Sequence, residues 1–290
     1  MLTKVEATAH KIEEAIKEFC EIAVIAVSGG VDSAVVASAA CAALGPEHVI
    51  LVSLPISETD RGVFNRRSAE LAAKLASRHL KVDLTALKEA FDQTLKAAIP
   101  ELTSKVTQAK PSVLSKSDAR IRTLLLYAVS EQLSASNDTL PLKRIRVIGS
   151  ANLSEELIGY NVKGGDALAD FFPLGDLFKS EVYQLARHYE VLPEIINAPP
   201  TSGLWGQKPF SEEVGFTHEA LEPAFVALLR ALRRGIKDNE LAITTEEFAR
   251  IDRKVGEFVI KRFTSNKHKR VMPRKVPLRG TEFVKDIFND

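Results

Sequence analysis

The chain has 290 residues, 45 % of them apolar and 27 % charged, a composition typical of a globular protein with a sizeable core. Its formal net charge of +1 excludes a global electrostatic argument for a nucleic-acid or membrane partner, and no apolar run approaches membrane-spanning length. The two cysteines, Cys20 and Cys41, lie in apolar helical patterns without metal-ligand spacing, so we expect buried thiols in a reducing cytoplasm. The amphipathic N-terminus carries acidic residues and is not typical of a targeting peptide.

The first predicted elements surround a glycine turn. Apolar periodicity predicts a helix over residues 2–19, and the apolar run 22–27 predicts a strand. The turn Ser28-Gly29-Gly30-Val31-Asp32-Ser33 then leads into the helix-favouring residues 34–44. Strand, glycine turn and helix together form a phosphate-binding geometry, because glycines allow a close approach and the N–H groups of the helix's first turn point at the anion.

Two side chains of this turn carry chemistry. Asp32 offers a carboxylate for a metal or a helix cap, and Ser33 offers a hydroxyl for phosphate. The string is neither the Walker A pattern, which needs a lysine, nor the dinucleotide pattern GxGxxG. An ordinary strand-to-helix turn is the alternative interpretation, since two glycines alone prove little.

Strand-like and helix-like segments alternate along the rest of the chain. Strands are predicted over 48–54, 80–84 and 144–148, and helices over 62–78, 87–98, 118–133, 177–189, 223–234 and 244–263. The polar segment 100–117 is read as a connection. This alternation predicts an α/β fold, a doubly wound parallel sheet flanked by helices, with ligands at the carboxyl ends of the strands. We expect one domain over 1–290, with the last helices packed onto the sheet.

Polar groups follow the strand predicted to end at residue 148. Asn152 or Ser154 could cap a short helix, but a cap does not explain the glycine-lysine-aspartate loop at 163–166. Lys179 lies in the first turn of a predicted helix, where a cation opposes the helix dipole and suggests a bound anion. The same reasoning applies to Arg120 near the start of the helix 118–133, although surface accident is an equal alternative there.

Two later segments have the composition of lids. Residues 199–215 are rich in Pro, Gly, Thr and Ser, and residues 267–275 carry a basic run. The basic run is short and lacks interleaved aromatic residues, so a nucleic-acid patch is disfavoured. We expect a mobile cationic segment, about 264–280, that closes over a phosphate-rich small molecule.

Six strings, taken together, are the basis of a family resemblance. They are SGGVDS, ARIR, GSANLSEELIGYNVKGGD, DFFPLGDLFKSEVYQLA, PPTSGLWGQ and NKHKRVMP. In this order and spacing the chain resembles the ammonia-dependent NAD synthetases of the ATP pyrophosphatase superfamily. The resemblance implies a Rossmann-like, adenine nucleotide alpha hydrolase-like fold. It also implies a homodimeric ligase that converts deamido-NAD, ATP and ammonia into NAD, AMP and pyrophosphate through an acyl-adenylate.

The resemblance also implies residue roles. The ATP site maps onto Ser28, Gly29, Gly30, Val31, Asp32, Ser33, Ser150, Lys179 and Thr201. The Mg²⁺ ligands map onto Asp32 and Glu155, and Asp32, Glu155 and Lys179 are the implied catalytic residues. The deamido-NAD contacts map onto Arg120, Lys163, Asp170, His268 and Lys269. Residues 1–21 leave no room before the first strand for a glutamine-hydrolysing domain, so the expected nitrogen source is free ammonia, or ammonia from a separate protein.

The chain departs from the family pattern at a few positions. Ser150 replaces the usual Thr and keeps the hydroxyl, and Lys116 stands where an Asn is common. Phe210 stands where an Asp is expected, so Glu212 or Glu213 would have to substitute in handling ammonia, or the activity differs. Two rival functions remain open: another SGGxDS enzyme that amidates or thiolates a different nucleotide or base, and a non-catalytic nucleotide-binding module.

Overall fold

A computed structural model describes residues 4–56, 60–101, 111–135, 144–201, 208–238, 240–243 and 246–271, except the side chains of 60, 61 and 111–115. The centre of the 199–215 lid segment, the lid residues 272–280 and the short helix expected near Phe283 lie outside the described residues.

The core of the fold is a four-stranded parallel sheet with the strand order β3-β2-β1-β4. Its strands are β1 (Ile22–Ala26), β2 (Val49–Ser53), β3 (Arg78–Lys81) and β4 (Ile145–Ile148). After β1 the chain crosses to β2 on one side, whereas β4 is added on the other side of β1. The predicted doubly wound sheet is therefore confirmed, and its topological switch point lies between the carboxyl ends of β1 and β4.

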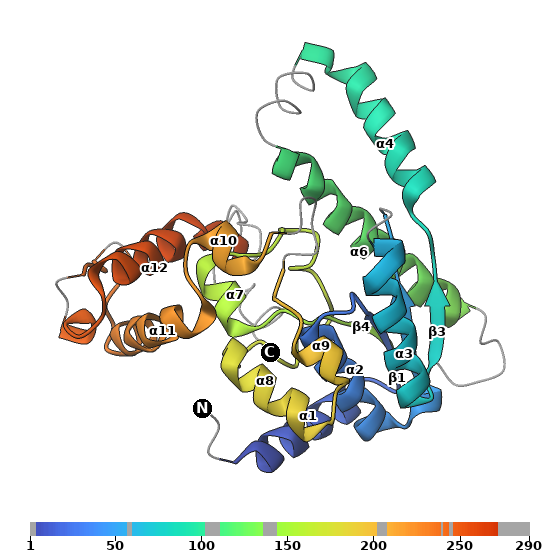
Figure 1. Ribbon diagram of the computed structural model, residues 1–290, viewed down its shortest axis with the longest axis horizontal. Coiled ribbons are helices and arrows are strands. Elements are labelled where there is room, and N and C mark those ends of the chain that lie inside the picture. Colours follow the sequence, from blue (N-terminus) through green and yellow to red (C-terminus); the bar gives the residue numbers. More distant parts are fainter. Residues whose placement is uncertain are drawn as a thin grey trace, which may run out of the picture.

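Helices cover both faces of this sheet (Figure 1). One face is covered by α1 (Val5–Phe19), α2 (Val31–Leu44), α3 (Asn65–Leu75) and α8 (Lys179–His188). The opposite face packs against α6 (Pro111–Ala135). Because side chains alternate along a strand, Ala23 and Ile25 of β1 belong to the first core and Val24 to the second. The remaining short helix on the first side is α9 (Pro193–Ile196).

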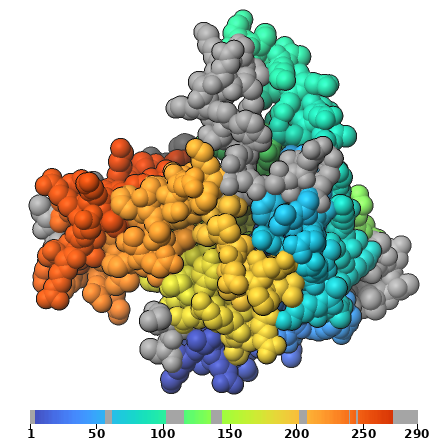
Figure 2. All heavy atoms as spheres, viewed as in Figure 1, coloured from blue at the N-terminus to red at the C-terminus, as the bar shows by residue number. Residues whose placement is uncertain are grey.

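The C-terminal helices form a separate cluster and do not pack onto the sheet as the sequence suggested. Helices α11 (His218–Arg233) and α12 (Arg253–Ser265) pack on each other, on α7 (Leu153–Ile158) and next to α10 (Phe210–Val214). Their core is aliphatic and aromatic, with Phe225, Leu228 and Val259 fully buried. The cluster is the orange and red part of Figure 2, on the side of the molecule away from β3 in Figure 1.

The α4–α6 region contains one correction to the sequence prediction. The sequence predicted a connection over 100–117, but α6 already begins at Pro111. A proline is tolerated there, because the first turn of a helix does not need its N–H group. Arg120 and Arg122 therefore lie well inside α6, and the dipole argument made for Arg120 does not apply. Helix α4 (Thr85–Ala98) has no buried residue and projects from the body of the molecule at the top of Figure 1.

Several further boundaries differ from the sequence prediction. Helix α3 ends at Leu75 because Ala76 turns into the left-handed region at φ 53°, and β3 starts at Arg78 to pair with Ile50. The single helix predicted over 244–263 starts only at Arg253, where the Asp252 side chain accepts the N–H groups of Lys254 and Val255. No helix of the described segments is both long and apolar enough to cross a bilayer.

Candidate active site

The loop after β1 has the geometry of an anion cradle at the start of α2. Gly29 has φ 77°, and a Cβ on it would lie 2.8 Å from the Phe64 carbonyl oxygen, so both conformation and space require glycine. The Ser33 hydroxyl accepts the Ser28 N–H at 3.2 Å and donates to the Gly30 carbonyl at 3.1 Å. These bonds fold the loop over the first turn of α2, whose N–H groups have no intrahelical partner.

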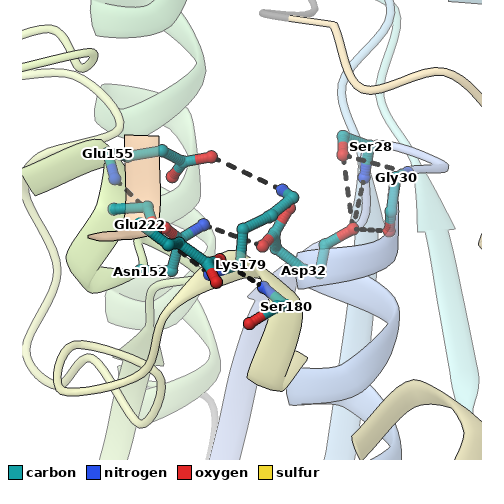
Figure 3. A network of polar contacts seen from close by, with 10 residues as sticks. Ser28, Gly30, Asp32, Asn152, Glu155, Lys179, Ser180 and Glu222 are labelled. Carbon is teal, nitrogen blue, oxygen red and sulfur yellow. Dashed lines mark hydrogen bonds and ion pairs between the residues drawn. The ribbon is translucent and has the colours of Figure 1, made fainter. Parts of the chain in front are cut away.

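Three charged side chains converge at the switch point (Figure 3). The Lys179 ammonium, at the first position of α8, donates to Oδ2 of Asp32 and lies 3.6 Å from Oε1 of Glu155. Asp32 lies in the first turn of α2, which follows β1, and Glu155 lies in α7, which follows β4. These three side chains come from distant parts of the sequence, and only the tertiary fold brings them together. They meet at the point where the strand order reverses.

A second layer of hydrogen bonds holds these three side chains in place. Asn152 caps α7 by accepting the Glu155 N–H at 3.1 Å, and its amide donates to Oδ1 of Asp32 at 3.0 Å. The Lys179 N–H donates to the Ser154 hydroxyl at 3.0 Å, and the Ser180 N–H donates to Glu222 at 2.9 Å. The N–H groups of Lys179 and Ser180, the first two of α8, are thus already hydrogen-bonded within the protein. A ligand at this point would meet the Lys179 side chain and not free N–H groups of the helix.

Burial and neighbouring charges shift the pKa values of Glu155 and Lys179. Burial and the nearby Asp32 carboxylate raise the pKa of Glu155 to about 7, although Lys179 acts in the opposite direction. Burial alone would lower the pKa of Lys179, but the carboxylates of Asp32 and Glu155 outweigh it and raise that pKa above its ordinary value. The two carboxylates therefore favour the ammonium form of Lys179, which is only 3 % exposed.

A cavity of about 290 Å³ opens over this cluster. It is lined by every residue that the sequence assigned to ATP, namely Ser28, Gly29, Gly30, Val31, Asp32, Ser33, Ser150, Lys179 and Thr201. Glu155 lines it as well. A phosphate cradle, a cation and two carboxylates in one cavity can bind and polarise a nucleoside triphosphate, although the individual roles stay predictions.

Comparison with known proteins identifies the family. The sequence model of the NAD synthase family matches residues 4–273. The chain belongs to this family. An NH3-dependent NAD+ synthetase of Methanoregula boonei is 34 % identical over 69 % of this chain and 73 % of its own. That of Methanocaldococcus jannaschii is 29 % identical over 92 % of this chain and 95 % of its own.

Solved structures agree with the family assignment. The NMN synthetase of Francisella tularensis superimposes with a TM-score of 0.69 at 25 % identity, covering 94 % of this chain and 98 % of its own. The NH3-dependent NAD synthetase of Campylobacter jejuni gives a TM-score of 0.63 at 25 % identity, covering 94 % and 99 %. The expected Rossmann-like fold of this NAD synthase family member is thereby confirmed.

The residues that the sequence assigned to deamido-NAD do not line the 290 Å³ cavity. Three of them are linked, because Arg120 donates to the Lys163 carbonyl at 3.2 Å and Lys163 donates to the His268 carbonyl at 2.5 Å. Lys269 donates to two carbonyls at the end of α7, Gly159 and Asn161, both at 2.7 Å. Asp170 accepts the Tyr127 hydroxyl at 3.1 Å and the Val147 N–H at 2.8 Å. Their contacts to a dinucleotide stay predictions.

The sequence interpretation assigned no role in the site to three residues in or next to the cavity. Asn152 supports the cluster from behind, whereas Asp166 and His218 line the cavity itself. Asp166 belongs to the glycine-lysine-aspartate loop singled out in the sequence, but His218 has no sequence signal. Neither Glu212 nor Glu213, the suggested substitutes for the missing acid at Phe210, lines the described cavity, and Glu213 accepts the Tyr160 hydroxyl at 2.6 Å.

His218 provides a pH-dependent contribution to stability. Burial, and then the charge of Lys179, lower the pKa of His218 to about 4, with Asp32 and Glu219 acting in the opposite direction. Since the unfolded chain takes up this proton near pH 6.5, the contribution is complete above that pH and is lost as pH falls towards 4. We expect a loss of about 2–3 kcal/mol across this window.

The measurement is urea unfolding of the wild type and of His218→Phe between pH 4 and 7. The difference in unfolding free energy between the two proteins should fall as pH falls, because phenylalanine cannot titrate. Parallel pH curves for the two proteins would contradict the assignment.

Proposed function

We propose that this protein is an ammonia-dependent NAD+ synthase, which converts deamido-NAD, ATP and ammonia into NAD, AMP and pyrophosphate. The observation that carries the proposal is the meeting of Lys179 with Asp32 and Glu155 beside the SGGVDS cradle, in a chain of the NAD synthase family. The rival of a non-catalytic module is disfavoured, since such a module has no need for these buried charges. The rival of a different amidated or thiolated nucleotide or base is disfavoured by the relatives named NH3-dependent NAD+ synthetase, with one exception, a mononucleotide, that is treated below.

The first step activates the nicotinate carboxylate. Its oxygen attacks the α-phosphorus of ATP, the bond from that phosphorus to the bridging oxygen breaks, and pyrophosphate leaves. The N–H groups at the start of α2 receive the pyrophosphate, and Lys179 neutralises charge that grows on the phosphates in the transition state. In the second step, neutral ammonia attacks the acyl carbon and AMP is expelled. The attacking nitrogen then loses one proton to water.

Asp32 and Glu155 are the proposed ligands of Mg²⁺. Magnesium is bound in nucleotide enzymes through one or two carboxylates together with substrate phosphates, and these two carboxylates already face a common cation, the Lys179 ammonium. The described residues hold no group of three or more potential metal ligands, which agrees with a site completed by the nucleotide. When bound, the ion offsets phosphate charge.

Other features expected from the sequence stay part of this proposal. Residues 1–290 act as one catalytic domain, residues 199–215 and about 264–280 close over the acyl-adenylate, and the active form is a homodimer in the cytoplasm. The described part of the basic segment supports a closing role, because Lys269 and Lys163 tie it to α7 and to the loop before Asp166. Exclusion of water matters because an acyl-adenylate hydrolyses readily.

The test is incubation of the purified protein with ATP, Mg²⁺, ammonium chloride and deamido-NAD. We expect NAD, AMP and pyrophosphate in equal amounts, and no turnover when deamido-NAD is omitted. Folded protein that forms neither NAD nor AMP would refute the proposal. Equal turnover with glutamine in place of ammonium would contradict the assignment of free ammonia as nitrogen source.

The NMN synthetase of Francisella tularensis supports a second candidate, amidation of the corresponding mononucleotide by the same chemistry. A parallel assay with nicotinic acid mononucleotide separates the two. A kcat/KM at least as high for the mononucleotide as for deamido-NAD would favour this second candidate.

A further inference from the structure

The His218 ring is held rigidly in the wall of the cavity. It lies at the first position of α11, is 5 % exposed, and lines the cavity that contains Asp32, Glu155 and Lys179. Its imidazole stacks on Phe210 with ring centroids 3.8 Å apart and planes 12° apart. Phe210 in turn meets Tyr160 edge to face at 5.0 Å. Stacking holds the imidazole in one plane, so its nitrogens can point only within that plane.

The imidazole has no hydrogen-bond partner in the part of the chain that the structure describes. Its Nδ1 is fully buried and unbonded. An unpaired polar atom in such a place costs about 1–3 kcal/mol, and folded proteins keep few of them. A ligand that pairs with the ring recovers this free energy, so the unpaired nitrogen points to a ligand.

The surroundings keep the imidazole unprotonated. His218 stands at the positive end of a 16-residue helix, and Lys179 lines the same cavity. A neutral imidazole carries one nitrogen with a free lone pair, which accepts a hydrogen bond. The other ring nitrogen carries the N–H, so a ligand that pairs with the accepting nitrogen has to present an N–H or O–H group.

Size and charge further restrict which ligands can bind next to His218. Because the Nδ1 atom is fully buried, a ligand as small as water or ammonia needs a smaller local shift to reach it than a nucleotide group does. A cation is disfavoured beside Lys179. Neutral ammonia satisfies both conditions, and when it is held through one of its N–H bonds its lone pair remains free to attack a carbonyl carbon.

We propose that His218 binds the attacking ammonia, accepting an N–H hydrogen bond on a ring nitrogen and so directing the ammonia lone pair towards the acyl-adenylate. This inference rests on the proposed function, because ammonia is the nucleophile of that reaction. His218 would then bind ammonia in place of Glu212 and Glu213, which do not line the cavity. Phe210 would position the His218 ring by stacking on it.

The first test compares the wild type with three variants. His218→Phe keeps a flat ring for stacking and removes both nitrogens, whereas His218→Asn and His218→Gln restore a polar group near the position of Nδ1 and of Nε2 respectively. The measured quantities are the KM for ammonium, the KM for ATP and deamido-NAD, and the deamido-NAD-dependent exchange of labelled pyrophosphate into ATP. The exchange reports the adenylation step alone.

For His218→Phe we expect the KM for ammonium to rise about 5–30-fold, as for the loss of one hydrogen bond, while the exchange rate and the other KM values stay within about 2-fold. Either the Asn or the Gln variant should recover part of the loss. An unchanged KM for ammonium, or an exchange rate that falls in parallel with amidation, would overturn the inference.

A second test needs no variant to fold. In wild-type protein labelled with ¹⁵N-histidine and saturated with ATP, ammonium chloride should shift the His218 ring nitrogens in a saturable way, and sodium chloride should not. NAD formation without such a shift would overturn the role of His218. A saturable shift in a protein that forms no NAD would instead refute the proposed function and leave the ammonia site standing.

Discussion

Replacing Lys179 by methionine is expected to lower turnover by about 10²–10³-fold, because a fixed cation facing the phosphates is lost from a water-poor site. The same change leaves Asp32 and Glu155 without their shared partner. Their side chains are 19 % and 22 % exposed, so the loss of unfolding free energy should be about 2 kcal/mol, below the range for fully buried pairs.

The matched control for this variant is Lys17→Met on the exposed side of α1. Its turnover should be unchanged, and its stability should stay within about 0.5 kcal/mol of the wild type. Steady-state NAD formation and urea unfolding measure the two effects. A Lys179→Met enzyme that retains a tenth or more of wild-type turnover would show that the ammonium is not part of the catalytic machinery.

Replacing Asp32 by asparagine should strongly reduce pyrophosphate release while leaving the fold intact. Asparagine has the same shape and its oxygen can still accept the Asn152 amide, which now donates at 3.0 Å. It removes the charge that faces Lys179 and that would bind Mg²⁺, so we expect a loss of about 10²–10³-fold in the adenylation step.

Pyrophosphate release with ATP and deamido-NAD, together with circular dichroism, measures this second effect. The exposed Asp176→Asn is the control, since it makes the same chemical change outside the cavity that contains Asp32. Wild-type turnover in Asp32→Asn would mean that the metal assignment is wrong.

The local parts of the site could be read from the sequence. The SGGVDS turn lies between a strand and a helix, and both neighbours have strong composition signals, so its shape follows from short-range rules. Lys179 was correctly placed in the first turn of a helix. Its observed partners, however, are Asp32 and Glu155, the first of them 147 positions away in the chain, and no periodicity encodes such a pairing.

The missed features have physical causes. Residues 111–117 read PSVLSKS and carry no apolar periodicity, so the first turns of α6 could not be seen as helix. The C-terminal helices have one apolar stripe each, and a stripe does not say whether it packs on a sheet or on another helix. His218 looks like any histidine at a helix start, and only the fold shows that its ring lies against Phe210 and lines the cavity.

Transfer of an oxygen atom from substrate to AMP is the most direct test of the proposed chemistry. Deamido-NAD labelled with ¹⁸O in both carboxylate oxygens is converted with unlabelled ATP and ammonium, and the products are analysed by mass spectrometry. An acyl-adenylate mechanism predicts one ¹⁸O atom in the phosphate of AMP and one in the amide of NAD. Unlabelled AMP, formed at the same rate as NAD, would contradict it.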